Sequence, residues 1–139
     1  VFDLRSLGER SILIDCDVLE ADGGTRTASI TGSYVALYDA VRWLQNRDLV
    51  DSSLIKDSVA AISVGIIDGT PMLDLCYAED SNADVDMNIV MTGSGAMVEI
   101  QGTAEQNPFT NDQLNTMLDL GRQGIEQLVT MQKQVLEIY

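Results

Sequence analysis

Apolar and polar residues alternate near the start of the chain. Over residues 10–19 every second position is apolar, namely Ile12, Ile14, Cys16 and Val18. This period of two predicts a half-buried strand. After a turn at 21–24, apolar or small residues recur every three or four positions, at Ala28, Thr31, Val35, Tyr38, Val41 and Leu44. This spacing predicts a helix that ends near 46–48, so the chain begins with a strand, a glycine turn and a helix.

The middle of the chain changes to short β-rich runs. Four runs are rich in β-branched and other apolar residues, over 58–67, 72–78, 87–92 and 96–101. Asp68-Gly69 and Gly93-Ser94-Gly95 separate successive pairs of runs. Because glycine tolerates positive φ, both segments are typical hairpin turns. The pattern therefore predicts an antiparallel sheet.

The last segment has the pattern of a long helix. Thr110 and Gln113 have the spacing of a capping box at its start, with Phe109 placed to pack against Leu114. One face is apolar, through Leu114, Met117, Leu118, Ile125, Leu128, Val129, Val135 and Leu136. The predicted fold class is therefore α+β, with a strand-helix unit followed by an antiparallel sheet and a long C-terminal helix.

The composition narrows the possible chemistry. The chain has 139 residues, with 8 Lys plus Arg against 22 Asp plus Glu, a net charge of −14, and 45% of its residues are hydrophobic. That apolar content can build a core, and the length predicts one domain. The absence of histidine excludes Ser-His-Asp and Cys-His nucleophile pairs and His-based zinc sites. Any acid or base must be a carboxylate, Lys, Tyr, a thiol or a group on the substrate.

The cysteines and the uncharged stretches indicate the redox state of the thiols and whether the chain carries a membrane helix. Cys16 and Cys76 each lie in an apolar run, which predicts two reduced core thiols in a cytosolic protein, with a single disulfide as the alternative. The longest uncharged stretches, 27–38 and 87–98, fall well short of the roughly 20 apolar residues of a membrane helix, so no membrane partner is expected. The chain begins at Val1, without an initiator Met or a positively charged leader, and continues directly into a segment with the pattern of regular structure. We therefore expect it to be a piece of a longer polypeptide.

A glycine pair, Gly23-Gly24, leads from the predicted strand into the predicted helix. Free N–H groups and the positive end of the helix dipole favour an anion at such a position. Arg26 supports this interpretation, because the dipole disfavours a cation in the first turn unless an anion is nearby. A plain glycine turn with Thr25 as the N-cap explains the pattern equally well. The residues alone leave both interpretations open.

A dense acidic run precedes the third β-rich segment. Glu79, Asp80, Asp84 and Asp86 fall within eight residues, and a hard cation such as Mg²⁺ would relieve the repulsion among such carboxylates. The run does not fit an EF-hand loop, because it lacks the glycine and the final glutamate. On the residues alone a solvated acidic loop is favoured. The polar residues around 99–105 are likewise expected to face water.

Several blocks together resemble one family. They are Leu7-Gly8-Glu9-Arg10, the segment 15–19, the segment 21–32, Glu79-Asp80-Ser81 with Asp86-Met87-Asn88, and the segment 99–105. In this order and spacing the chain is similar to the ribonuclease PH family over essentially its whole length. The resemblance implies a ribosomal-protein-S5-domain-2-like fold. It also implies that residues 1–139 form a single domain, the C-terminal portion of the enzyme, whose N-terminal half precedes Val1.

The resemblance implies a phosphate-dependent 3′ to 5′ exoribonuclease that trims transfer RNA precursors and releases nucleoside diphosphates. Gly24, Thr25 and Arg26 would bind inorganic phosphate, the co-substrate. Asp80 and Asp86 would be the catalytic aspartates, placed for general acid work or for holding Mg²⁺. An acid form of Asp80 would assist the departing 3′ oxygen if the pair shifts its pKa. Because phosphate is already an anionic nucleophile, this chemistry needs no histidine.

The expected partners are transfer RNA precursors and other RNA 3′ ends, further copies in a hexameric ring of dimers, and the N-terminal half of the enzyme. From Ser58 onward only Arg122 and Lys133 oppose twelve acidic residues, so RNA-binding arginines are expected in the N-terminal half or in neighbouring copies. The expected location is the cytoplasm. Two alternatives stay open: a non-catalytic ring subunit of the same family, and an acidic module that binds divalent ions.

Overall fold

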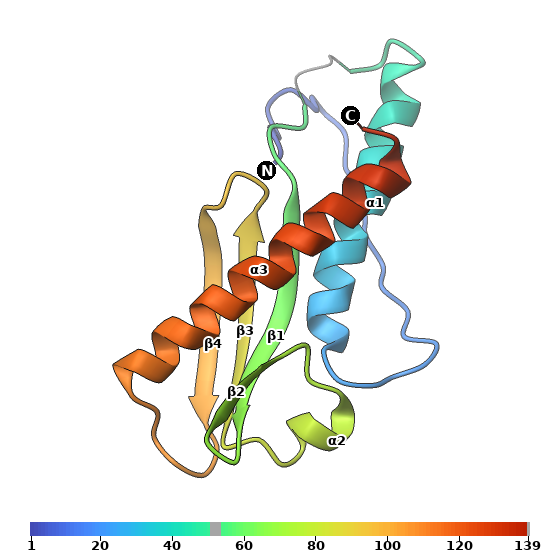
Figure 1. The fold of residues 1–139 in the computed structure, drawn as a ribbon. Coiled ribbons are helices and arrows are strands. Elements are labelled where there is room, and N and C mark those ends of the chain that lie inside the picture. The colour runs from blue at the N-terminus through green and yellow to red at the C-terminus, as the bar shows by residue number, and fades with distance from the viewer. Residues whose placement is uncertain (51–53, 139) are drawn as a thin grey trace.

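The computed structural model describes residues 1–50 and 54–138. Its helices and strands, labelled in Figure 1, follow one another as α1 (Thr25–Gln45), β1 (Val59–Ile67), β2 (Thr70–Leu73), α2 (Tyr77–Asp80), β3 (Val85–Thr92), β4 (Met97–Ala104) and α3 (Asn111–Leu136). The predicted order of a first helix, a sheet and a long last helix is confirmed.

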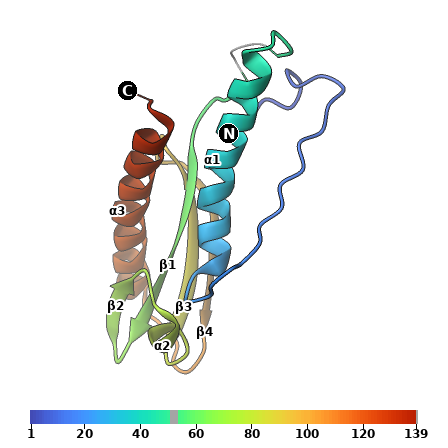
Figure 2. The same cartoon turned by 90° about the vertical axis from the view of Figure 1, so that its right-hand side faces the viewer.

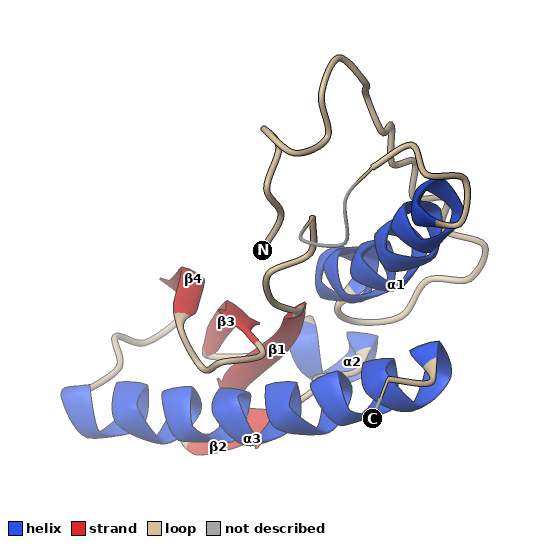
Figure 3. Cartoon of the chain, turned by 90° about the horizontal axis from the view of Figure 1, so that it is seen from above, coloured by secondary structure: helices blue, strands red, loops and turns tan. Residues whose placement is uncertain are grey.

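The four strands form one antiparallel sheet in the order β2-β1-β3-β4. Figures 2 and 3 show α3 on one face of the sheet and α1 on the other. The turn between β1 and β2 has positive φ at both Asp68 and Gly69 (48° and 75°), as a tight two-residue hairpin requires. The predicted α+β class and the antiparallel sheet are therefore confirmed.

The main core lies between the sheet and α3. Alternate residues of β1 and β3 point toward this helix, and the buried set is Ala60, Ile62, Val64, Ile66, Val85, Met87, Ile89, Met91, Met117, Ile125 and Val129. The helix starts at the predicted capping box, in which Thr110 and Gln113 exchange side-chain and backbone hydrogen bonds. The other face of β1 and β3 is left for α1 and for polar residues.

Helix α1 is attached to the part of β1 that β2 does not cover. The Thr31 hydroxyl donates to the carbonyl of Ala61 and accepts from its N–H group, at 3.1 and 3.0 Å. The buried Gln132 side chain of α3 donates to the carbonyls of Thr31 and Val59, both at 3.0 Å. These contacts join α1, β1 and α3 and fix where the N-terminus of α1 lies over the sheet.

The prediction of a strand over 10–19 is wrong. The segment is extended but pairs with no strand among the described residues, and it runs along the outer side of α1 in Figure 2. Leu13 and Leu19 are each 93% exposed, and Ile14 and Val18 about half exposed. An alternating pattern fits a strand, but a strand also needs a partner for its backbone, and here none is present.

Three smaller predictions also need correction. The run at 72–78 is not one strand, because Asp74 adopts a positive φ of 58° and the Cys76 N–H is then capped by Glu79 at the start of α2. In α1 the predicted stripe is confirmed at Val41, which is buried, but Ala28 is exposed, and the other buried residues, Thr27 and Tyr34, lie outside the stripe. Val135 of α3, predicted on the apolar face, is exposed.

The cysteines also differ from the prediction of two buried thiols. Both cysteines are free in the structure, but Cys16 is exposed and Cys76 is only partly buried. Cys16 is exposed because the segment that carries it has no strand beside it, so its side chain reaches only the surface of α1. The alternative of a disulfide between the two cysteines is excluded in this structure.

Candidate active site

The predicted phosphate-binding turn forms the N-terminus of α1. Gly24 is the N-cap, with φ 73° and ψ 28°, and Thr25 is the first helical residue. This left-handed backbone favours glycine. No side chain caps the helix, and Ala28 is the first residue whose N–H reaches an acceptor within the helix, the carbonyl of Gly24 at 2.9 Å. The N–H groups of Thr25 and Arg26 therefore have no partner among the described residues, which suits them to bind an anion.

The same turn is held against the start of α2. A Cβ on Gly23 would lie 2.0 Å from the carbonyl oxygen of Leu75, so only glycine allows this approach. The Asp22 carboxylate accepts a hydrogen bond from the N–H of Tyr77, the first residue of α2. This bond holds the pKa of Asp22 below its ordinary value. The glycine turn and α2, which ends at Asp80, are therefore fixed relative to each other.

Arg26 is engaged by an acidic residue of the sheet. Its Nη2 donates to both oxygens of Glu99 on β4, at 2.9 and 3.0 Å. About half of the Arg26 side chain and two fifths of the Glu99 side chain remain exposed. The cation in the first turn thus has an anion beside it, as the dipole argument requires, and in this structure that anion is a carboxylate of the protein.

The two predicted catalytic aspartates lie close enough to influence each other. Asp80 ends α2, and Asp86 is the second residue of β3, opposite Gly65 of β1. Burial raises the pKa of Asp86, and the negative charges of Asp80 and of Glu105 raise it further. A carboxyl group with a raised pKa beside a second carboxylate is the arrangement used for acid catalysis and for cation binding.

The acidic residues offer a pair of carboxylates for a metal ion. Among the described residues no group of three or more His, Cys, Asp or Glu side chains converges as a metal-binding set. Mg²⁺ commonly keeps several waters and takes only one or two protein carboxylates. The mutual repulsion that raises the pKa of Asp86 is what a divalent cation would relieve. The Asp80 and Asp86 pair therefore fits Mg²⁺, and the two carboxylates together would hold it.

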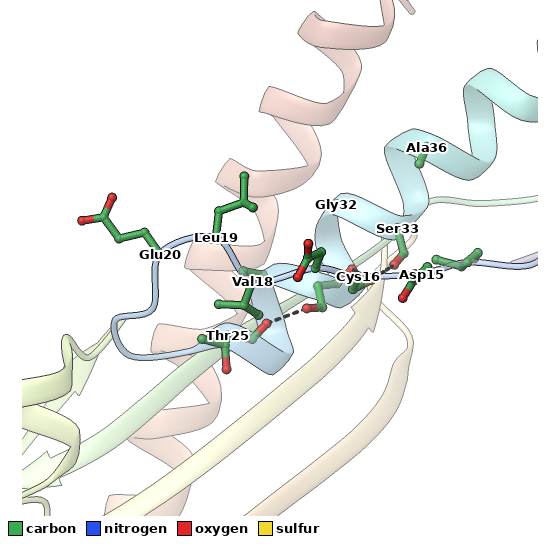
Figure 4. A pocket seen from close by; sticks show the side chains of 13 residues that line it. Asp15, Cys16, Val18, Leu19, Glu20, Thr25, Gly32, Ser33 and Ala36 are labelled. Atoms are coloured by element: carbon green, nitrogen blue, oxygen red, sulfur yellow. Dashed lines mark hydrogen bonds between the residues drawn. The ribbon is translucent and has the colours of Figure 1, made fainter.

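A groove of about 450 Å³ lies between the extended segment 10–19 and α1, and Thr25 lines one end of it. Figure 4 shows Cys16 and Ser33 next to each other in the lining of this groove, with 3.3 Å between Sγ and Oγ.

The sequence-predicted residues are thus brought to one end of the sheet. Gly24, Thr25 and Arg26 form the start of α1, and α2 connects that turn to Asp80 beside Asp86. Sequence reasoning missed Glu99, which was expected to face water. The available signal was its place in the block 99–105 that resembles the family.

The family follows from two comparisons. Residues 57–124 match the model of the 3′ exoribonuclease family, domain 2. The chain belongs to the ribonuclease PH family of 3′ exoribonucleases. Its resemblance to a ribonuclease PH from Syntrophomonas wolfei subsp. wolfei is 56% identity over 138 residues, which is 99% of this chain and 58% of that protein. The chain spans somewhat more than half the length of that relative.

A solved structure supports the fold. The crystal structure of rice (Oryza sativa) Rrp46 superposes with a TM-score of 0.67 at 16% identity, covering 84% of this chain and 49% of that one. The likeness confirms the predicted fold, which is consistent with the ribosomal-protein-S5-domain-2-like type. None of the helices in the described part of the chain has the length and apolar character needed to cross a membrane.

Proposed function

We propose that residues 1–139 form a single domain, the C-terminal portion of a phosphate-dependent 3′ to 5′ exoribonuclease that trims transfer RNA precursors. The observation that carries the proposal is the attachment of the uncapped N-terminus of α1, through Asp22 and Tyr77, to the helix that ends at Asp80. An anion-binding turn and a carboxylate pair are the two parts that phosphorolysis needs. Membership of the ribonuclease PH family supports the same reaction.

In the proposed reaction an oxygen of inorganic phosphate attacks the phosphorus of the last phosphodiester of the RNA. A bond forms between these atoms, the bond from phosphorus to the 3′ oxygen of the preceding nucleotide breaks, and a nucleoside diphosphate leaves. The N–H groups of Thr25 and Arg26 hold and orient the phosphate, with Gly24 forming the turn and the Arg26 guanidinium adding charge. No strong base is needed, since the nucleophile is already ionised.

The departing 3′ oxygen needs a proton or a positive charge. We expected Asp80 to supply the acid, but burial and the negative charge of Asp80 raise the pKa of Asp86, so we assign the proton to Asp86. When Mg²⁺ is bound it would neutralise negative charge on the reacting phosphates. Asp80 and Asp86 would hold it there, so the same pair serves either as acid or as metal ligands.

The RNA itself must be bound largely by other surfaces. Twelve acidic residues against Arg122 and Lys133 after position 58 make this chain a poor match for a polyanion. We propose that the N-terminal half and neighbouring copies in a hexameric ring supply the basic contacts. The exposed apolar residues Leu13 and Leu19 support association with further protein. We place the enzyme in the cytoplasm, where RNA 3′ ends are processed.

The proposal is tested with the complete gene product that carries these residues and a short RNA with a single-stranded 3′ end. We expect nucleoside diphosphates to be released only when inorganic phosphate is present. Release of nucleoside monophosphates without phosphate would contradict the proposal. If RNA is bound but no nucleotide is released under either condition, the alternative of a non-catalytic ring subunit is correct. Binding of Mg²⁺ with no effect of phosphate would instead favour an acidic ion-binding module.

A further inference from the structure

The strand beneath the α1 N-terminus contains a buried hydroxyl group that no part of the fold uses. Ser63 lies in the middle of β1, in a run of buried residues, and is only 4% exposed. Its backbone carbonyl accepts from the N–H of Asp74 at 2.8 Å. Its side-chain oxygen has no hydrogen-bond partner among the described residues. A buried hydroxyl without a partner is costly, because it loses its bonds to water and gains none.

The position of this hydroxyl is close to the phosphate-binding turn. Ser63 lies on the face of β1 turned away from α3, since its neighbours Ile62 and Val64 belong to the core under that helix. A Cβ built on Gly24 would lie 3.5 Å from Ser63 Oγ and 3.0 Å from Thr27 Oγ1. The space next to Gly24 that a side chain would occupy is therefore bordered by two hydroxyl groups.

Only one of the two hydroxyl groups still has a hydrogen available for a hydrogen bond. Thr27 is also buried, and its hydroxyl donates to the carbonyl of Gly24 at 2.8 Å. Its hydrogen is already used. The hydrogen of the Ser63 hydroxyl is not, and it lies beside the turn whose N–H groups are also without acceptors. A bound oxyanion would supply the acceptor that both lack.

The geometry points to Ser63 as a further ligand of the oxyanion held at the N-terminus of α1, donating from beneath while the backbone N–H groups donate from the helix. This inference rests on the proposed function, because it takes inorganic phosphate as the anion. It adds a residue that lies 39 positions from Gly24 in the sequence and inside an otherwise apolar strand. Phosphate would then contact the sheet as well as the helix.

The test is Ser63→Ala, measured by titration of inorganic phosphate into the complete gene product at constant ionic strength. Because the hydroxyl has no partner in the fold, its removal should leave the melting temperature unchanged or higher. Phosphate affinity should fall about tenfold or more, as expected for a lost hydrogen bond to a charged group. Ser63→Cys keeps a weaker donor of similar size, so its phosphate affinity should lie between those of the parent protein and Ser63→Ala.

A matched control is Ser33→Ala, which removes a hydroxyl from α1 eight residues beyond Thr25, or about 12 Å along the helix. It should bind phosphate as the parent protein does. If the parent binds phosphate and Ser63→Ala binds it equally well, the inference is wrong and the proposed function stands. If the parent itself shows no saturable phosphate binding, the proposed function fails and the inference fails with it.

Discussion

One nitrogen of Arg26, Nη2, contacts both carboxylate oxygens of Glu99, at 2.9 and 3.0 Å. The two residues are 73 positions apart, on α1 and β4, and both side chains are partly exposed. An ion pair of this kind contributes only about 0 to 1 kcal/mol to stability. In the proposed site, phosphate carries more charge than a carboxylate and would also bind the helix N–H groups, so it would replace Glu99 as the partner of Arg26 at small cost.

We expect Glu99→Gln to tighten phosphate binding. The substitution removes a negative charge that competes with the anion for Arg26, and it keeps the size of the side chain. Because phosphate would no longer have to break a surface ion pair worth up to about 1 kcal/mol, its affinity should rise by up to about fivefold. Phosphate affinity of the complete gene product, measured by titration at low and at high salt, checks this. The gain should shrink at high salt because exposed charges are screened.

The Arg26→Ala background provides the control for this expectation. Arg26→Ala alone should weaken phosphate binding about tenfold or more and leave the melting temperature nearly unchanged, since the side chain is half exposed. In that background Glu99→Gln should have a smaller effect than in the parent. If Glu99→Gln instead weakens phosphate binding in the parent, then Glu99 orients Arg26 for the anion and does not compete with it.

The sequence predicted an element correctly where the folded chain supplies the packing partner that the local pattern requires. Strand β1, the turn at Asp68-Gly69 and the capping box at Thr110 follow from residues close together in the sequence. Residues 10–19 have an equally clear alternation, yet form no strand, because alternation defines two faces but cannot supply a partner for the backbone. In α1 the stripe was predicted correctly at Val41, which joins a small buried cluster. It missed the buried Thr27 and Tyr34, because residues with polar groups carry no clear signal of burial in a pattern of apolar positions.

The candidate site was predictable only in part. The glycine turn at Gly24 with Arg26 left an anion site and a plain turn equally open. The acidic run alone favoured a solvated loop, and only the resemblance to the family assigned roles to Asp80 and Asp86. The pairing of Arg26 with Glu99 depends on the register of β4, which no local pattern encodes. The unpartnered hydroxyl of Ser63 was invisible, because only the three-dimensional structure shows that a buried serine has no acceptor.

Asp80→Asn and Asp86→Asn are each expected to abolish most turnover. If the two carboxylates act as one acid or metal site, the double variant should be no slower than the slower single variant. RNA affinity should be unchanged or slightly higher, because a negative charge near the polyanion is removed. Rates of nucleoside diphosphate release from the parent, both single variants and the double variant decide the matter. A double variant whose loss equals the product of two modest single losses would show two independent roles.

Asp86→Asn should also stabilise the protein in a pH-dependent way. Burial and the charges of Asp80 and Glu105 raise the pKa of Asp86 above its ordinary value of 3.8. The folded state therefore holds this proton more tightly than the unfolded state. As the pH rises from 3.8 through the raised pKa, the parent loses stability that the variant does not lose. Melting temperatures across this range in metal-free buffer should diverge, with the variant higher at neutral pH.

An exposed carboxylate on α3 supplies the reference for that measurement. Asp119→Asn removes the same charge from the protein at a position that is open to solvent. The difference between its melting temperature and that of the parent should stay constant across the same pH range. If Asp119→Asn gives the same divergence as Asp86→Asn, the effect comes from net charge and not from the site.

Transfer of isotopically labelled inorganic phosphate distinguishes phosphorolysis from hydrolysis most directly. The complete gene product is incubated with an unlabelled RNA, Mg²⁺ and phosphate labelled with radioactive phosphorus, and the released nucleotides are separated. If the turn at Gly24 and Arg26 presents phosphate as the nucleophile, the label appears in the β-phosphate of nucleoside diphosphates, and Arg26→Ala lowers its incorporation. Unlabelled nucleoside monophosphates as the only products would contradict this mechanism.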